Sequence, residues 1–385
     1  MQYKPKDFNI GVLGGGQLGK MLHQESLCLD LQLHFMDSNT SSSVAKVSPH
    51  FTQGNINDYN DVYNFGKDKD ILTIEIEHVN LDALKDLEEL GVKVYPQYNI
   101  LKIIQDKGMQ KEFIVENKFP TAPFLFVQDQ NEIHSLLQSG SIQYPFVQKL
   151  RRGGYDGKGV SIIRNENDLY KLLEGECIIE KLADIDKEIS VIAVRSSSGQ
   201  TKVYPSVSMD FHPTANLVEF LICPAEINNQ TEERAQNLAL ELLNKLQIVG
   251  LLAVEMFLNK DGSIWINEMA PRPHNSGHHT LVNGSISQFS NHLRALVGLQ
   301  LGDTQGNQTA IMLNLLGEEN YFGETCVTGL ENVLSVPGIF VYLYGKDETK
   351  PFRKMGHVTI LDKEVSLCKK KANLVKEHLK IISSN

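Results

Sequence analysis

The first hundred residues alternate between short apolar runs and amphipathic stretches. Residues 8–13 (FNIGVL) are mostly apolar and lead into GGGQLGKML, a glycine turn that opens a predicted helix. Two further apolar runs, LQLHFMD and ILTIEIE, end at Asp37 and Glu77. Strands that alternate with helical stretches are typical of a parallel α/β sheet. The pattern therefore predicts an N-terminal parallel α/β unit over residues 1–105.

After residue 105 the pattern becomes mixed. The segment DKGMQKEFIVENK has the spacing of a helix, and FPTAPFLFV is a connection interrupted by prolines. Helices and hairpin-like strands continue to about residue 300, and short strands, the basic loop KPFRKMGH and a closing helix complete the chain. We therefore expect an α/β and α+β protein of three units, with residues 1–105 followed by 106–300 and by a small β-rich unit, 301–385.

The composition agrees with several domains and disfavours some partners. A chain of 385 residues is too long for one ordinary core, and 41% hydrophobic with 22% charged residues is typical of a soluble globular protein. No apolar run approaches the roughly 18 residues of a membrane span. The net charge of −10 disfavours nonspecific binding to nucleic acid. We expect neither nucleic acid nor a membrane as a partner.

The cysteines and the first residues indicate a cytoplasmic location. The start, MQYKPKDFNIGVLGGG, has neither the apolar core nor the cleavage site of a signal peptide. The cysteines are odd in number and form no CxxC pair, which favours reduced thiols over a disulfide or zinc framework. They are Cys28, Cys177, Cys223, Cys326 and Cys368.

The stretch RRGGYDGKGV, residues 151–160, joins two apolar alternating segments and is predicted to be a hairpin tip. It does not match a nucleotide-binding P-loop, because Lys158 is followed by Gly159 and a strand, and not by Ser or Thr and a helix. Its glycine N–H groups could nevertheless cradle phosphate oxygens. A mobile exposed hairpin with incidental charges is the alternative. The cations that would favour phosphate are Lys149, Arg151, Arg152 and Lys158.

Two glutamates are predicted to face each other in the segment 250–279. Asp261-Gly262 between apolar runs is a strong hairpin signal, and a two-residue loop there would pair positions whose numbers add up to 523. Glu255 and Glu268 would then be opposed, with Cβ atoms about 4.5–5.5 Å apart. Two buried carboxylates at that distance cannot both be ionised without compensation.

A divalent cation such as Mg²⁺ is the compensation that we expect, with the oxygen of Asn267 as a third donor. The alternative is that one glutamate pairs with Arg272. The same register predicts the two faces of the hairpin, both apparently buried. It places Ala253, Phe257, Ile264 and Ile266 on the face of the glutamates, and Val254, Met256, Leu258 and Trp265 on the other.

With these residues in view, the chain resembles the ATP-grasp superfamily and, within it, the 5-(carboxyamino)imidazole ribonucleotide synthase family. The resemblance covers nearly the whole chain. Its motifs are GGGQLGKM, DKGMQKEF, RRGGYDGKG, WINEMAPRPHNSGHHT, NGSISQFSNHLRA and RKMGH.

This resemblance implies an ATP-dependent carbon–nitrogen ligase of purine biosynthesis. ATP would convert bicarbonate to carboxyphosphate, and the exocyclic amine of 5-aminoimidazole ribonucleotide would capture the carboxyl group. The implied fold has an N-terminal α/β domain, a central ATP-grasp domain and a small C-terminal domain, and members are commonly homodimers. ATP and Mg²⁺, or Mn²⁺, are the implied cofactors.

The resemblance also implies the residues of the nucleotide site. Lys149 would bind phosphate, the glycine loop would close over the phosphates, Glu180 and the residues after it would meet adenine, and Glu188 would bind ribose. The ATP-binding set is Lys107, Lys149, Gly154, Tyr155, Asp156, Gly157, Lys158, Gly159, Val160, Glu180, Lys181, Leu182, Ala183, Glu188, Phe211, Asn267 and Glu268. The metal ligands are Glu255, Glu268 and Asn267.

The implied substrate residues come from all three units. Arg272 and His274 would hold bicarbonate and carboxyphosphate, and Tyr155 and Asp156 would face the amine. These four form the catalytic set. Those expected to bind the ribonucleotide are Gln17, Leu18, Glu77, Lys346, Arg353 and Lys354.

The chain departs from the family pattern at two places. Lys107 stands where relatives often carry Arg, which keeps the charge but loses the bidentate fork. Where relatives show an acidic residue and a His near ATP, this chain has Ser208 and Phe211, and His212 follows one position later. Either His212 replaces that contact through a small register shift, or Phe211 packs there.

Other interpretations use parts of the same sequence. Gly14-x-Gly16-x-x-Gly19 with Asp37 also matches a dinucleotide-binding fingerprint, which would indicate an NAD-dependent dehydrogenase. A different ATP-grasp ligase, or a nucleotide-binding regulator without catalysis, would account for the later motifs. His278 and His279 could suggest a transition-metal site, but we expect them to be polar or packing residues.

Overall fold

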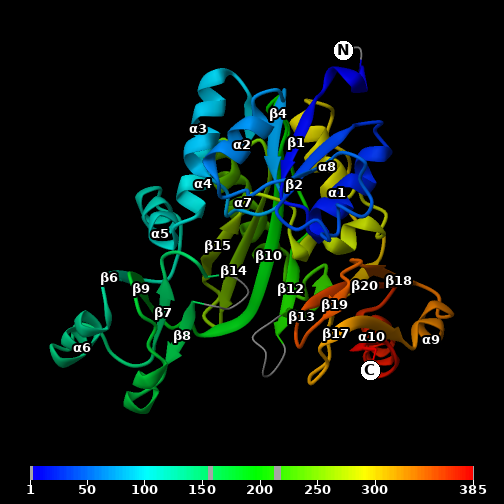
Figure 1. Cartoon of the computed structure of the whole chain (residues 1–385). Coiled ribbons are helices and arrows are strands. Elements are labelled where there is room, and N and C mark those ends of the chain that lie inside the picture. The colour runs from blue at the N-terminus through cyan, green and yellow to red at the C-terminus, as the bar shows by residue number, and fades with distance from the viewer. Residues whose placement is uncertain (1–2, 155–158, 212–217, 385) are drawn as a thin grey trace.

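The computed structural model describes residues 3–154, 159–211 and 218–384. Its N-terminal part is a five-stranded sheet in the order β3-β2-β1-β4-β5, and all of its pairings are parallel (Figure 1). The strands are β1 (Ile10–Leu13), β2 (Leu33–Asp37), β3 (Phe51–Gln53), β4 (Ile71–Ile74) and β5 (Lys93–Tyr95). The predicted parallel α/β unit is confirmed.

Helices cover both faces of this sheet because β1 and β4 are apolar on both sides. One core joins β1 and β2 to helix α1, while a second joins β4 to α2 and α3. The short helix η1 precedes β1, and α4 leads out of the unit. These helices are η1 (Pro5–Asp7), α1 (Gln17–Leu27), α2 (Tyr59–Gly66), α3 (Leu81–Leu90) and α4 (Tyr98–Ile104).

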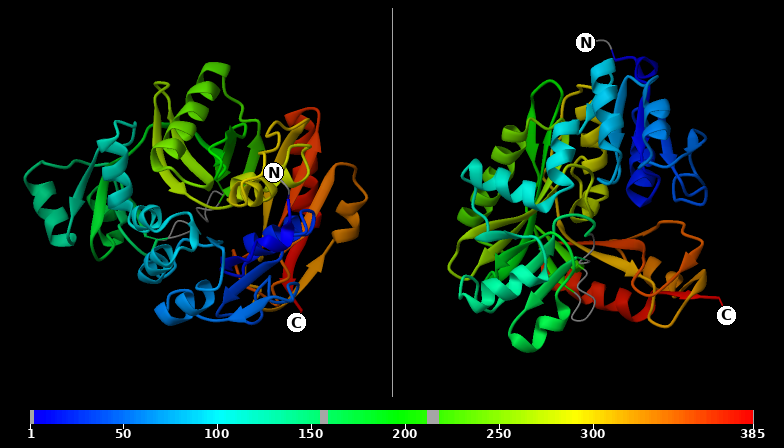
Figure 2. Two further views of the ribbon diagram at one scale, coloured as in Figure 1. Left: turned by 90° about the horizontal axis from the view of Figure 1, so that it is seen from above. Right: turned by 60° about the vertical axis from the view of Figure 1, so that its left-hand side comes forward.

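A separate four-stranded sheet follows α5 (Lys107–Glu116), in the order β6-β9-β7-β8. The glycine-rich stretch joins two antiparallel strands of this sheet, as predicted for a hairpin tip. Seen from above in Figure 2, the sheet stands to one side of the remaining molecule. Its elements are β6 (Phe124–Val127), α6 (Gln130–Gln138), β7 (Phe146–Leu150), β8 (Val160–Ile163), η2 (Glu166–Lys171) and β9 (Cys177–Lys181).

A nine-stranded sheet forms the body of the molecule, in the order β15-β14-β10-β12-β13-β16-β20-β18, with β11 paired to β10. Strands β16, β20 and β18 come from the last part of the chain, so this sheet continues across residue 300. The strands are β10 (Ile185–Arg195), β11 (Thr201–Val203), β12 (Val207–Phe211), β13 (Val218–Cys223), β14 (Gly250–Asn259), β15 (Ile264–Ala270), β16 (Thr309–Leu316), β18 (Ile339–Leu343) and β20 (Lys354–Asp362).

The amphipathic helix α7 (Asn229–Leu246) packs on one face of β10 and β14 and closes the largest core of the chain. The helices η3 (Asn275–Leu281) and α8 (Gln288–Leu296) follow β15, and α8 contributes Phe289 and Leu293 to the core of the N-terminal unit. This shared core holds the N-terminal sheet against the nine-stranded sheet.

The last segments complete the β-rich end. They are β17 (Gly323–Thr328), α9 (Leu330–Leu334), β19 (Glu348–Thr349), α10 (Val365–His378) and β21 (Lys380–Ser383). Helix α10 packs against β16 and β20 through Cys368, Ala372 and Val375. None of the helices in the described ranges is long and apolar enough to cross a membrane.

Candidate functional site

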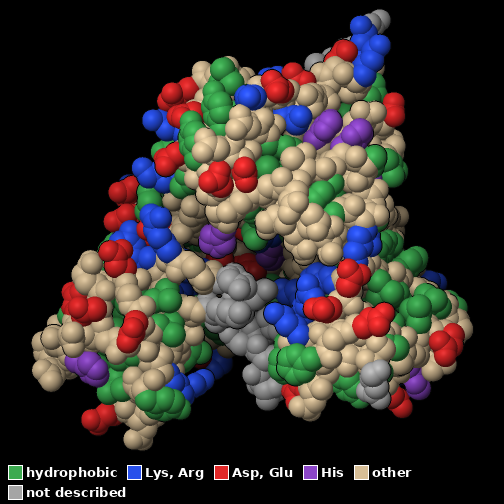
Figure 3. Space-filling view, in the orientation of Figure 1, with side chains coloured by type: hydrophobic (Ala, Val, Ile, Leu, Met, Phe, Trp, Pro, Cys, Tyr) green, Lys and Arg blue, Asp and Glu red, His purple; other side chains and the backbone are tan. Residues whose placement is uncertain are grey.

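A cleft of about 680 Å³ opens where the three parts of the molecule meet. Figure 3 shows this hollow, with acidic and histidine side chains at its upper edge and Lys and Arg side chains beside it. It lies at the carboxyl ends of β1 and β4, where ligands bind in open α/β sheets. The predicted residues that line it are Gln17, Leu18, Glu77, Lys107, Gly154, Glu255, Glu268, Arg272, His274 and Lys354.

Glu255 on β14 is paired with Glu268 on β15, so the predicted opposition of the two acids is confirmed. The predicted two-residue loop is wrong. The backbone N–H of Asn259 donates to the carbonyl of Ser263 at 2.8 Å, so three residues form the turn, and Gly262 lies in the left-handed region with φ +80°. A β-bulge next to Glu255 then shifts the register back by one residue, so the glutamates face each other after all.

The same offset overturns the predicted faces of the hairpin between the turn and the bulge. Trp265 is opposite Phe257, so it lies on the face of the glutamates, while Ile264 and Ile266 lie on the other face. Those two isoleucines are buried in the core under α7 together with Val254, Met256 and Leu258. A one-residue change of register moves every side chain to the opposite face, which is why three assignments are wrong together.

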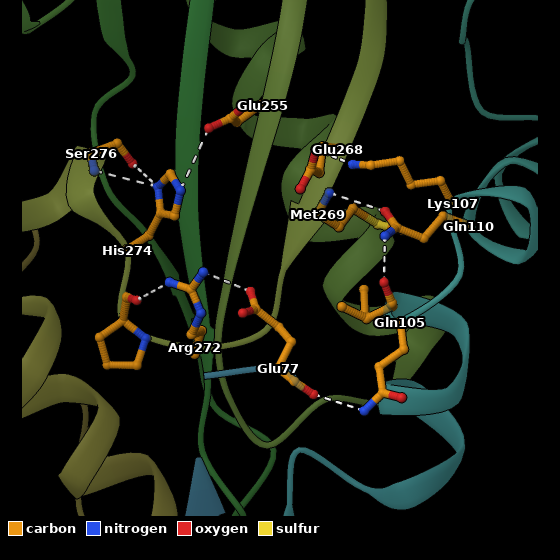
Figure 4. Close-up of polar contacts among 12 residues, drawn as sticks. Glu77, Gln105, Lys107, Gln110, Glu255, Glu268, Met269, Arg272, His274 and Ser276 are labelled. Atoms are coloured by element: carbon orange, nitrogen blue, oxygen red, sulfur yellow. Dashed lines mark hydrogen bonds and ion pairs between the residues drawn. The ribbon is translucent and has the colours of Figure 1, made fainter. Parts of the chain in front are cut away.

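The bulge allows two consecutive residues of β15 to reach lysines. Lys107 Nζ lies 2.6 Å from Glu268 Oε2, and Lys149 Nζ donates to Asn267 Oδ1 at 2.7 Å. Lys107 is the first residue of α5, and Figure 4 shows it extending from that helix toward Glu268. The sequence resemblance assigned Lys107 to ATP, and here its ammonium group neutralises a carboxylate.

The two opposed glutamates differ in proton affinity. Burial, the neighbouring Glu268 and Glu188 raise the pKa of Glu255 to about 7. Burial also acts on Glu268, but Lys107, Lys149 and His274 together hold the pKa of that carboxyl below its usual value. The pair therefore carries one firmly ionised carboxylate and one that holds its proton near neutral pH, unless a cation is added.

Glu180, which the resemblance predicts to contact adenine, directs its carboxylate into the protein. Its two oxygens lie 3.0 Å from Lys111 Nζ and 2.8 Å from Lys149 Nζ, and all three side chains are less than a tenth exposed. Burial lowers the pKa of Lys111 to about 8, although Glu180 partly opposes this. Sequence reasoning missed Lys111. Its position in DKGMQKEF, one helical turn after Lys107, was the available signal.

The first arginine of the glycine-rich stretch is also already paired. Arg151 donates to both oxygens of Asp106, from Nε at 3.0 Å and from Nη2 at 2.7 Å, and Arg152 Nε lies 3.4 Å from the same carboxylate. Asp106 caps α5 by accepting from the N–H groups of Gly108 and Met109. Arg151 therefore anchors the base of the hairpin, which differs from the expected role in phosphate charge compensation.

Arg272 and His274 follow β15 and point into the cleft (Figure 4). Arg272 Nη2 lies 2.7 Å from Glu77 Oε1, so an arginine of the central part binds an acid of the N-terminal unit. His274 Nε2 lies 3.5 Å from Glu255 Oε1, while its Nδ1 lies 2.8 Å from the hydroxyl of Ser276. The expected alternative, a pair between Arg272 and one of the opposed glutamates, does not form.

Comparisons with known proteins agree along the whole chain. The ATP-grasp domain matches residues 112–289, the ribonucleotide synthetase preATP-grasp domain residues 8–105, and the phosphoribosylaminoimidazole carboxylase C-terminal domain residues 310–371. The N5-carboxyaminoimidazole ribonucleotide synthase of Bacillus subtilis is 37% identical over 357 residues, which are 91% of each chain. The chain belongs to the N5-carboxyaminoimidazole ribonucleotide synthase family.

Solved structures of this family have the same fold. That of N5-carboxyaminoimidazole ribonucleotide synthetase from Thermotoga maritima has a TM-score of 0.89 at 37% identity and covers 98% of this chain and 100% of that one. The Aspergillus clavatus enzyme, in complex with ADP and 5-aminoimidazole ribonucleotide, has a TM-score of 0.86 at 28% identity, over 96% and 98% of the chains. The predicted resemblance and fold class are confirmed.

Some curated relatives are longer. The phosphoribosylaminoimidazole carboxylases of Candida glabrata and Vigna aconitifolia are 36% and 35% identical, and the chain spans 65% and 64% of their lengths.

Several family positions expected to bind the ribonucleotide are brought together, and one is not. Gln17, Leu18 and Glu77 line the cleft with Lys354. Lys346 Nζ donates to the carbonyl of Lys354 at 2.6 Å, next to the cleft. Arg353 does not line the cleft, and its Nη1 donates to the carbonyl of Glu348. Arg353 precedes β20, which begins at Lys354, and its side chain is directed to the carbonyl of Glu348.

Glu75 is a cleft residue that sequence reasoning missed. It accepts from the N–H of Gly16 at 2.5 Å, and burial raises the pKa of its carboxyl to about 7, with Asp37 adding to the shift. It stands two residues before Glu77 at the end of an apolar run, a spacing that would put both acids on one side of an extended chain. That was the signal available in the sequence.

The arrangement around Gly14–Gly16 speaks against the dinucleotide-binding interpretation. The N–H of Gly15 donates to Asp37 Oδ2 at 2.8 Å, and that of Gly16 donates to Glu75. A dinucleotide needs these N–H groups for its pyrophosphate. Carboxylates occupy that position instead and would repel a phosphate.

Of the remaining predicted ATP residues, some lie on or beside strands, some follow Glu180, and some lie outside the described part of the chain. Lys149 lies on β7 next to its last residue, Gly159 directly precedes Val160 at the start of β8, and Glu188 lies on β10, where burial raises its pKa to about 7. Lys181, Leu182 and Ala183 follow Glu180 and are at least partly exposed. Outside the described residues and side chains lie Tyr155, Asp156, Gly157, Lys158, the side chain of Phe211, and His212.

Proposed function

We propose that the chain catalyses the ATP-dependent carboxylation of 5-aminoimidazole ribonucleotide with bicarbonate. The exocyclic amine would receive the carboxyl group from carboxyphosphate, giving 5-(carboxyamino)imidazole ribonucleotide, ADP and phosphate in purine biosynthesis. The observation that carries this proposal is the cleft in which the opposed pair Glu255 and Glu268 faces Arg272 and His274. One end suits a nucleotide with its metal, and the other suits an anion and a ribonucleotide.

The opposed glutamates fit a hard divalent cation, Mg²⁺ or Mn²⁺. Their donors are carboxylate oxygens, and the raised pKa of Glu255 indicates that added positive charge would be accepted there. No group of three or more His, Cys, Asp or Glu ligands occurs in the described part of the chain, so substrate phosphates would complete the coordination. When bound, such an ion would supply positive charge to the transferring phosphoryl group.

The protein groups around this position would bind the phosphates, the ribose and the adenine of the nucleotide. Lys149 and Lys107 would share the phosphate charge, in competition with their present partners, which are Asn267 and Glu180 for Lys149 and Glu268 for Lys107. Asn267 becomes available as a third oxygen donor only after Lys149 has moved. Glu188 would receive the ribose, and the backbone of Lys181–Ala183 would meet adenine.

Arg272 is suited to hold bicarbonate and then carboxyphosphate, because its planar fork matches a bidentate oxygen anion. Its present partner, Glu77, comes from the unit that would bind the ribonucleotide. Carboxyphosphate hydrolyses readily, so the cleft has to exclude water while the amine attacks. Lys346 and Lys354 would hold the ribonucleotide phosphate. The catalytic roles of Tyr155 and Asp156 stay predictions from the resemblance.

An ADP-release assay with bicarbonate, run with and without 5-aminoimidazole ribonucleotide, tests the proposal. We expect release to depend strictly on both substrates. In Arg272→Ala, ligation should fall by about 10²-fold or more while slow ATP hydrolysis without ribonucleotide persists. Arg353→Ala, outside the cleft, is the matched control. Dependence on a different acceptor would indicate another ATP-grasp ligase, and oxidation or reduction of a nicotinamide cofactor without ATP would indicate a dehydrogenase.

Three further expectations accompany the function. The chain would divide at residues 1–105, 106–300 and 301–385, with the nine-stranded sheet continuing across the last boundary. A homodimer rests on the family resemblance, and analytical ultracentrifugation would test it. A cytoplasmic location is supported by the absence of disulfides among the described cysteines.

A further inference from the structure

His274 has a ring whose two nitrogens face different kinds of partner (Figure 4). Nδ1 lies 3.3 Å from the backbone N–H nitrogen of Ser276 and 2.8 Å from the Ser276 hydroxyl. Nε2 points to the cleft, where Glu255 Oε1 lies 3.5 Å away. His274 caps the start of η3 through this contact with Ser276, so local backbone geometry fixes the ring on its Nδ1 side.

The backbone N–H of Ser276 decides which nitrogen carries the proton. An N–H can only donate, so Nδ1 has to offer its lone pair. In a neutral imidazole one nitrogen donates and the other accepts, which leaves the proton on Nε2. The opposite tautomer would place an Nδ1–H group against the N–H of Ser276.

A second serine extends the same direction of donation. The hydroxyl of Ser276 lies 2.9 Å from the hydroxyl of Ser190, and both residues are only 1% exposed. When the Ser276 hydroxyl donates to Nδ1, its lone pair accepts from Ser190. Ser190 on β10 is paired directly with Glu255 on β14, so the last donor of this chain stands beside the glutamate on the neighbouring strand. Hydrogen bonds aligned in this way strengthen one another.

We propose that Ser276, supported by Ser190, is a positioning residue that fixes His274 in the neutral tautomer protonated at Nε2. His274 then acts as a hydrogen-bond donor to an oxygen of an anion in the cleft, and not as a base. That this anion is bicarbonate or carboxyphosphate rests on the proposed function. The tautomer itself rests only on the contacts of Ser276 and Ser190.

Nitrogen-15 NMR of the full-length protein labelled at histidine tests the tautomer without any turnover. The two ring nitrogens of His274 are assigned by their loss in His274→Gln. We expect Nδ1 to show the shift of an unprotonated nitrogen and Nε2 that of a protonated one. A proton on Nδ1, or an equal mixture of tautomers, in the unmodified protein would overturn the proposal.

Variants then separate the serine from general effects on folding. Ser276→Ala keeps the backbone N–H that donates to Nδ1 and removes only the hydroxyl, so Nε2 should remain the main proton position while the fraction of His274 protonated at Nδ1 increases. The KM for bicarbonate should rise about 5- to 10-fold, with a smaller change in the KM for ATP. Ser276→Thr, which keeps the hydroxyl, should restore both. Ser190→Ala should give a smaller change of the same kind, and Ser135→Ala on the exposed helix α6 should give none.

The two proposals fail in different ways. A His274 spectrum unchanged in both Ser276→Ala and Ser190→Ala would remove the assigned role of the serines, whatever the activity. The expected tautomer in a protein that releases no ADP with 5-aminoimidazole ribonucleotide would uphold the serines and overturn the proposed function.

Discussion

Two neighbouring groups of charged side chains have opposite imbalances of charge. Around Glu180, one carboxylate lies between two lysines, Lys111 and Lys149. Around Glu268, two opposed carboxylates have one lysine, Lys107, within ion-pair distance. The lysines lower the pKa of Glu180 against the effect of burial, while burial and Glu268 raise the pKa of Glu255 to about 7.

The difference indicates what each group can accept. The Glu180 group has an excess of positive charge and suits phosphate oxygens. The opposed glutamates gain an excess of negative charge when Glu255 releases its proton, and they then suit a metal ion. Asn267 links them, because it precedes Glu268 and accepts from Lys149. A nucleotide with a divalent cation carries both kinds of charge, so the proposed ligand would correct both imbalances.

The largest effect is expected from removing charge on the glutamate side. Glu268→Gln should lower ATP turnover by roughly 10³-fold or more, because several kcal/mol of charge stabilisation depend on the ion held there. The ADP-release assay measures this, with a thermal unfolding curve to show that the variant is folded. Near-normal turnover in a folded variant would contradict the assignment of a metal to this pair.

Removing charge on the other side should affect stability. Glu180→Gln leaves two buried lysines without their anion and should cost about 3–5 kcal/mol of unfolding free energy, measured by urea denaturation. The double variant Glu180→Gln/Lys111→Met removes one charge of each sign and should recover part of that loss. A loss below about 1 kcal/mol in the single variant would show that the group is not held as a unit.

Lys111 gives this group a pH dependence. Its folded pKa is lowered to about 8, below the usual value for a lysine, so the unfolded chain binds more protons at alkaline pH. Stability should therefore rise as pH increases from about 8 toward the usual lysine pKa, by up to about 3 kcal/mol. Urea denaturation at several pH values, compared with Lys111→Met, isolates the effect, and an equal slope in both proteins would rule out Lys111 as its source.

The smallest effect concerns a cation that lies outside both groups. Lys354 lines the cleft and Arg353 does not, so Lys354→Ala should raise the KM for the ribonucleotide about tenfold, and Arg353→Ala by less than about twofold. Steady-state kinetics with varied ribonucleotide measures both. Equal increases would show that the cleft binds phosphate through the whole basic loop.

The sequence predicted the parallel N-terminal sheet and the opposed glutamates because both follow from local patterns. An apolar run that enters a glycine turn identifies β1, apolar runs ending in acids identify β2 and β4, and a glycine turn between apolar runs identifies the hairpin of β14 and β15. The hairpin also shows the limit of such reasoning. A longer turn and a bulge each shift the register by one residue, and only their combination returns Glu255 to Glu268. In the segment between the turn and the bulge, the prediction placed Trp265, Ile264 and Ile266 on the wrong faces of the hairpin.

The rest of the site depends on contacts between distant segments. Nothing near Lys111 or Glu180 in the sequence shows that they meet, because 69 positions separate them and the pair forms through packing of α5 on β9. Glu77 meets Arg272, and Gly16 meets Glu75, for the same reason. Local pattern can identify charged residues at strand ends, but which partner neutralises each one is decided by the tertiary fold.

The continuity of the nine-stranded sheet has a mechanical consequence. Glu255 and Lys354 are carried by strands of one hydrogen-bonded sheet, so the proposed metal position and the basic end of the cleft are held within one rigid element. Lys149 belongs to the smaller sheet, which is joined to β15 by the isolated bridge between Thr121 and Ile266. Binding of a nucleotide between the two sheets would therefore change the position of Lys149 relative to Glu255 more readily than the position of Lys354.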